Sequence, residues 1–159
     1  MGLFDDGRVP LELTIAGRMA LAAVLGFLIG LERESRGKSA GERTFAIMAL
    51  GAAGFAGTAI TMFPETAGQA VAGVATGIGF LGVGIIWRAE AGETRGLTTA
   101  ASILCVAALG VVTGIGLYLT AIVGTALALF ILESDRMPGL RGLHRRVTGR
   151  SDMDEDEQS

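Results

Sequence analysis

The segment Gly30-Leu31-Glu32-Arg33-Glu34 carries two carboxylates on either side of a cation. Hard cations such as magnesium prefer oxygen ligands, so Glu32 and Glu34 are candidate metal ligands. On a continuous helix their side chains lie about 200° apart, so they could chelate one ion only if the helix ended there. Glu32 also precedes Arg36 by four residues, the spacing of a helical ion pair. The segment therefore predicts either a magnesium site or a salt-bridged helix end.

A second polar segment reads Arg95-Gly96-Leu97-Thr98-Thr99. Either threonine can cap the start of a helix. Thr98, Ser102 and Cys105 then fall on one helical face. This polar stripe predicts hydrogen bonds between helices. An ion site or a partner site is the alternative interpretation.

Arg18 stands inside an apolar stretch, about two helical turns from its outer end. An arginine at this depth can reach the membrane interface or form a structural ion pair. The alternative is a functional charge inside a helix bundle, because ionisable groups within membranes are costly and often functional.

The sequence does not predict an enzyme. It contains no nucleophile–base arrangement, no phosphate-binding loop and no metal cluster of standard spacing. One cysteine and one histidine exclude a disulfide framework and a histidine-based metal site. Trp87 and Tyr118 lie near predicted helix ends, which suits a membrane aromatic belt. We therefore expect no catalytic residues, no nucleic-acid binding and no certain cofactor, with magnesium as the candidate ion.

Apolar stretches must position these residues. Half of the 159 residues are hydrophobic and 25 are glycine, which is typical of packed transmembrane helices. A bilayer core of about 30 Å needs about 20 apolar residues per helix. We predict an all-α integral membrane protein with a transmembrane domain over 13–133. Its five expected helices cover about 13–31, 44–63, 69–87, 97–113 and 116–132. A re-entrant loop is the alternative for the last two.

Basic residues predict the orientation. Outside the helices, eleven basic residues fall on one side of the expected membrane, with four in 32–43, two in 88–96 and five in the tail. The other side carries only the one before the first helix. Lys and Arg are in excess in cytoplasmic loops, so an extracytoplasmic N-terminal segment 1–12 and a cytoplasmic C-terminus follow. We expect 134–150 to form a basic juxtamembrane segment and 151–159 an acidic, disordered tail.

Glycines mark the expected helix contacts. Gly26 and Gly30 share a face of the first helix with Arg33, and Gly51 lies on the second. Glycines on two opposite faces of the third helix predict that it is central, with close neighbours on both sides. The expected packing glycines are Gly26, Gly30, Gly51, Gly73, Gly77, Gly79, Gly82 and Gly84.

Four segments in order resemble the MgtC/SapB family of bacterial and archaeal membrane proteins. They are residues 26–34, 40–44, 77–84 and 95–102, and the resemblance covers about 15–133. It implies a multi-pass protein of the prokaryotic inner membrane, linked to growth at low magnesium. Many members carry a soluble C-terminal domain, for which residues 133–159 are too short. Thr98 stands where some members have Asn, and Cys105 where some have Cys.

The resemblance implies two functions. The first is a regulator that binds other membrane proteins, including the proton-translocating ATP synthase. The second is a transporter or channel for magnesium or another divalent cation. In both functions the lipid bilayer is a partner. A homo-oligomer is a further candidate assembly. The candidate functional residues are Arg18, Glu32, Arg33, Glu34, Arg43, Thr44, Arg95, Thr98, Thr99 and Cys105. Of these, we expect Glu32, Arg33, Glu34, Arg43 and Arg95 to form one polar cluster beneath the bundle.

Overall fold

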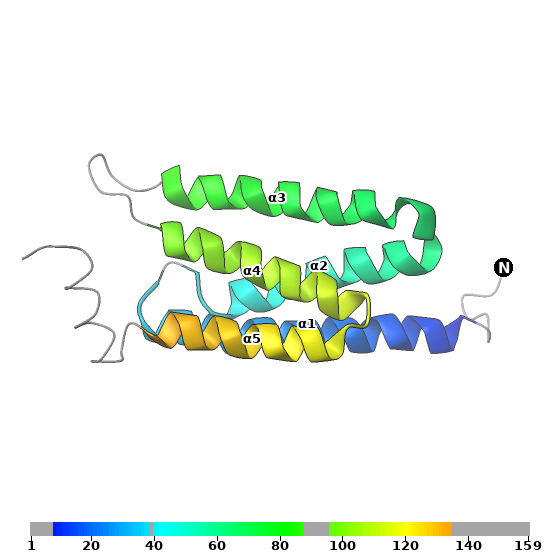
Figure 1. The fold of residues 1–159 in the computed structure, drawn as a ribbon, viewed down its shortest axis with the longest axis horizontal. Coiled ribbons are helices and arrows are strands. Elements are labelled where there is room, and N and C mark those ends of the chain that lie inside the picture. The colour runs from blue at the N-terminus through cyan, green and yellow to red at the C-terminus, as the bar shows by residue number, and fades with distance from the viewer. Residues whose placement is uncertain (1–7, 39, 88–95, 135–159) are drawn as a thin grey trace, which may run out of the picture.

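The computed structural model describes residues 8–38, 40–87 and 96–134. Five α-helices run antiparallel to their neighbours in the chain (Figure 1). They are α1 (Val9–Ser35), α2 (Glu42–Met62), α3 (Ala67–Trp87), α4 (Leu97–Gly114) and α5 (Tyr118–Glu133), with the short 3₁₀ turn η1 (Pro64–Thr66) before α3. Arg95, the basic segment from 135 to 150 and the acidic tail 151–159 lie outside the described residues.

The helices confirm the predicted fold class. Four helical stretches, Val9–Ser35, Glu42–Met62, Pro64–Ile86 and Leu97–Gly114, are long and apolar enough to cross a membrane, and α5 is a shorter apolar helix. Helix α1 has 27 residues and exceeds the expected 13–31 at both ends. Pro10 occupies its first turn, where the missing N–H costs no hydrogen bond. Its charged ends, Glu12 in the first turn and Arg33 in the last, match the helix dipole.

The apolar run 97–130 forms two helices joined by a short turn. Gly116 in that turn has φ +91°, a conformation that favours glycine because it has no Cβ. The chain reverses there, and α5 returns beside α1 (Figure 1).

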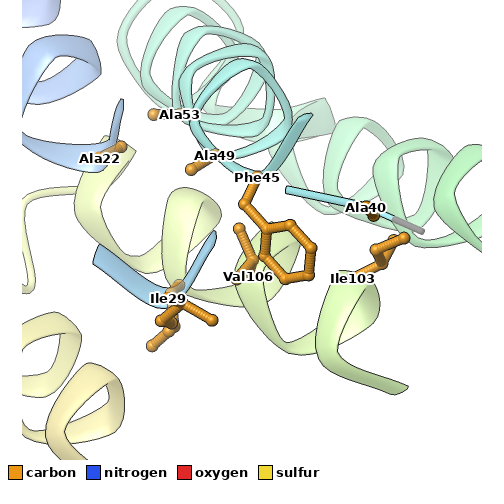
Figure 2. Packing of buried hydrophobic residues seen from close by; sticks show 9 residues of the cluster. Ala22, Ile29, Ala40, Phe45, Ala49, Ala53, Ile103 and Val106 are labelled. Carbon is orange, nitrogen blue, oxygen red and sulfur yellow. The ribbon is translucent and has the colours of Figure 1, made fainter. Parts of the chain in front are cut away.

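Helix α4 is the central element of the bundle, since it contacts each of the other four helices. The largest fully buried apolar side chains are Phe45, Ile29, Ile103 and Val106, contributed by α1, α2 and α4. Figure 2 shows Phe45 directed toward Val106, with alanines of α2 beside them. The core therefore lies at the meeting of three helices.

Glycines bring these three backbones close together. A Cβ on Gly26 would lie 2.6 Å from the Phe45 carbonyl oxygen, and one on Gly30 would overlap the Cα of Glu42. On the other side of α2, a Cβ on Gly110 would lie 2.5 Å from the Ala49 oxygen. Gly114 approaches the backbone of Ala53 in the same way. Helix α2 is thus held between glycine faces of α1 and α4.

The expectation that the third helix is central is wrong. A Cβ added to its glycines would meet nothing within 4 Å except at Gly82, where Ala100 is in ordinary contact at 3.7 Å. The same open space surrounds Gly51 on α2. Only 6% of the apolar span over Pro64–Ile86 is buried, against 56% for α4. Lipid and a neighbouring helix are equally apolar, so the glycine pattern alone could not distinguish a packed face from an open one. Of the expected packing glycines, those with open faces are Gly51, Gly73, Gly77, Gly79 and Gly84.

Candidate functional site

The candidate site is the polar end of the bundle, where α1 and α5 finish and α2 and α4 begin. At its centre lies Arg33, whose side chain is 2% exposed. Its Nη2 donates a hydrogen bond of 3.0 Å to the Thr99 hydroxyl oxygen, and Thr99 is buried as well. Arg33 follows Gly30 by three residues, so it continues the face of α1 that packs into the bundle. The pair joins the last turn of α1 to the first turn of α4.

Glu34 caps the start of α2. Its Oε2 accepts a hydrogen bond of 3.3 Å from the backbone N–H of Glu42, the first residue of that helix. A carboxylate there is favourable because the helix dipole is positive at its N-terminus. Gly41 makes the approach feasible, since a Cβ at this position would overlap the Glu34 carboxylate.

Glu32 belongs to a different group of side chains. Its Oε1 forms an ion pair with the Arg36 Nε, which confirms the predicted i, i+4 pair. The Arg36 Nη2 also reaches the Glu133 Oε2 at 3.3 Å, on α5. Arg36 therefore bridges the last turns of α1 and α5.

These contacts bear on the predicted magnesium site. Helix α1 continues through Ser35, so it does not end where Glu32 and Glu34 would have to chelate a shared ion. Glu32 and Glu34 instead have separate partners on opposite sides of α1. Within residues 8–38, 40–87 and 96–134, no group of three or more His, Cys, Asp or Glu side chains could hold a metal ion.

The described polar residues of this end form several small groups in place of the expected single cluster, of which Arg95 lies outside the described residues. Arg43 points outward, with its side chain 92% exposed and its Nε 3.8 Å from a Glu42 oxygen. Thr44 and Thr98 are exposed. The sequence placed Arg33 and Arg43 in the same expected cluster, yet only Arg33 is buried in the structure.

The polar stripe predicted on α4 does not bridge helices. Ser102 donates its hydroxyl hydrogen to the Thr98 carbonyl oxygen of its own helix at 2.7 Å, and Cys105 is exposed. Thr99, the neighbouring residue on a different face, instead accepts a hydrogen bond from Arg33 of α1. A rotation of about 100° per residue decides which threonine enters the bundle.

Arg18 lies toward the opposite end of the bundle, where it contacts residues on both sides of the turn between α4 and α5. Its Nη1 donates to the Gly114 carbonyl oxygen at 3.0 Å, and its Nε donates to the Tyr118 hydroxyl oxygen at 3.2 Å. A cation suits the C-terminus of α4, where the helix dipole is negative. This geometry supports the structural interpretation of Arg18.

Sequence reasoning missed several residues that matter here. The sequence predicted Arg36 only as the partner of Glu32, and it singled out neither Glu42 nor Glu133, although these residues complete the contacts of the polar end. Gly110 and Gly114 were also missed as packing residues. Their spacing of four, the small-xxx-small pattern, was the signal that could have identified them.

Comparison with known proteins finds one matching family profile and several similar proteins. A profile of the MgtC family matches residues 19–137. The chain is 44% identical to protein MgtC of Salmonella typhimurium over 108 residues, which is 68% of this chain and 46% of that protein. It is 42% identical to protein MgtC of Brucella abortus over 117 residues, 73% of this chain and 49% of that protein.

Another relative is covered more completely. Protein SrpB of Synechococcus elongatus is 39% identical over 135 residues, which is 76% of this chain and 74% of that protein. The chain spans about half the length of the MgtC proteins it matches. No solved structure matches it.

Proposed function

Since this chain belongs to the MgtC family, we propose that it is a non-catalytic regulator in a prokaryotic cell membrane. In this proposal it acts in magnesium homeostasis by packing against other membrane proteins. The proton-translocating ATP synthase, implied by the family resemblance, is the first partner to test. The observation that carries the proposal is the open face of α3. An apolar helix with five glycines in open space offers a neighbouring helix a close backbone approach.

The interior of the bundle supports the same proposal. Buried hydroxyls of Thr113 and Thr125 donate to carbonyl oxygens one turn earlier in their own helices. Gly110 and Gly114 close the space between α4 and α2 by backbone contact. In the part of the chain that the structure describes, the carboxylates lie near helix ends, whereas ion pathways usually place them within the membrane. A divalent-cation transporter is therefore the less favoured function.

Substituting Gly77 with leucine tests the proposed partner surface. Gly77→Leu should leave folding intact, because nothing lies within 4 Å of its Cβ position. It should weaken copurification with the ATP synthase roughly tenfold, since overpacking an interface costs about 1–3 kcal/mol. Gly17→Leu is the matched control, because Gly17 on α1 is equally open. Its copurification should equal that of the wild type.

Two outcomes would count against this function. Equal copurification of Gly77→Leu and wild type would remove α3 from the partner surface. Magnesium flux above that of empty vesicles, in proteoliposomes holding only this protein, would favour the transporter.

We also propose that the N-terminus is extracytoplasmic and that the polar end faces the cytoplasm. The excess of basic residues in the connections at that end supports this orientation. In a Cys105→Ser background, Glu65→Cys should react with an impermeant thiol reagent added to intact cells. Lys38→Cys should react only after the membrane is permeabilised. The reverse labelling pattern would refute this orientation.

A further inference from the structure

A groove lies between the ends of α1 and α5, beside the contacts described above. Its volume is about 520 Å³, and it is lined by Leu31, Glu32, Ser35, Leu129, Phe130 and Glu133. Leu31 and Phe130 are about half exposed and belong to the apolar stretches of their helices. The groove therefore has an apolar wall and a polar rim, and its rim lies where the helices leave the apolar layer.

Glu32 carries an unsatisfied buried oxygen at this rim. Its side chain is only 9% exposed, and its Oε1 is taken by the Arg36 ion pair. No described residue donates a hydrogen bond to its Oε2, which is buried. A buried carboxylate oxygen without a donor among the described residues is unfavourable, so the site favours binding of a group that offers an N–H or O–H.

We propose that this groove binds a phospholipid whose headgroup carries a primary ammonium, such as phosphatidylethanolamine. The ammonium offers three N–H donors and a positive charge, and one N–H would satisfy the Glu32 Oε2. The acyl chain would lie against Leu31 and Phe130. A lipid fits better than a soluble amine because the larger part of the lining is apolar.

The headgroup chemistry gives a sharp test. Phosphatidylcholine has the same charge and can carry the same acyl chains, but its trimethylated nitrogen has no N–H. Phosphatidylglycerol has no cation. Wild-type protein is reconstituted with equal amounts of the three lipids and extracted in mild detergent, and the bound lipids are counted by native mass spectrometry. Phosphatidylethanolamine should be retained about tenfold over each of the others, the size expected for one charge-assisted hydrogen bond.

Glu32→Gln should abolish this preference, because the neutral amide does not attract an ammonium. Glu12→Gln is the matched control, since Glu12 is an exposed residue in the first turn of the same helix. Leu31→Trp narrows the groove while leaving the Glu32–Arg36 pair in place, so it should also lower retention. This variant keeps the proposal testable if Glu32→Gln fails to fold. Equal retention of the three lipids by the wild type would overturn the proposal. Either a preference for phosphatidylglycerol or an unchanged preference in folded Glu32→Gln would overturn it too.

Discussion

Replacing Gly110 with alanine is expected to prevent stable folding of this chain. The added Cβ would lie 2.5 Å from the Ala49 carbonyl oxygen and 3.0 Å from the Ala49 Cα, both backbone atoms of α2. Backbone atoms in a packed helix cannot turn away as a flexible side chain can, so α2 and α4 must separate. Overpacking typically costs about 1–3 kcal/mol, and occasionally more, and here it disturbs the contact at the centre of the bundle. Gly114→Ala meets Ala53 in the same way and should behave alike.

The measurement is the fraction of monodisperse protein after heating in detergent, by size-exclusion chromatography. Gly77→Ala is the control, because it makes the same substitution in a transmembrane helix where the Cβ meets open space. It should equal or exceed the wild type, since alanine favours a helix over glycine by about 1 kcal/mol. If Gly77→Ala were the damaging change and Gly110→Ala harmless, the assignment of α4 as the central helix would be wrong.

Replacing Arg33 with alanine should produce the second large loss of stability. The Arg33 side chain is 2% exposed and donates to Thr99 between α1 and α4. Its removal leaves a cavity and an unpaired hydroxyl, so we expect a loss of about 2–5 kcal/mol, mostly from lost packing. Thr99→Val removes only the hydroxyl of this contact and should cost less, about 0.6–1.7 kcal/mol.

Arg43→Ala is the matched control for this prediction. Arg43 lies in the same charged stretch of the sequence as Arg33, residues 32–43, but its side chain is 92% exposed. Its substitution should change the free energy of unfolding by less than about 0.5 kcal/mol. Thermal or denaturant unfolding in detergent, followed by circular dichroism, measures all three variants. Comparable losses from Arg33→Ala and Arg43→Ala would show that burial does not distinguish the two arginines.

The candidate site was only partly predictable. Spacing along one helix sufficed for the Glu32–Arg36 pair, because both partners lie on α1 and a separation of four residues brings them together. The partners contributed by other helices could not be obtained in that way. The Thr99 contact of Arg33 and the Glu133 contact of Arg36 join residues far apart in the sequence. They depend on how each helix is rotated about its axis.

The sequence by itself determined that this is an all-α membrane protein, where its apolar stretches lie and which connections carry its charges. Length and hydropathy decide these properties locally, because backbone polar groups in a bilayer must be satisfied within each helix. Only the tertiary structure decided which arginine is buried, which threonine faces α1 and which glycines are packed. Gly77 and Gly110 both lie in apolar helices, yet one meets open space and the other the backbone of α2. The physical reason is that lipid is as apolar as a neighbouring helix, so hydrophobicity does not distinguish these surroundings and close packing selects between them.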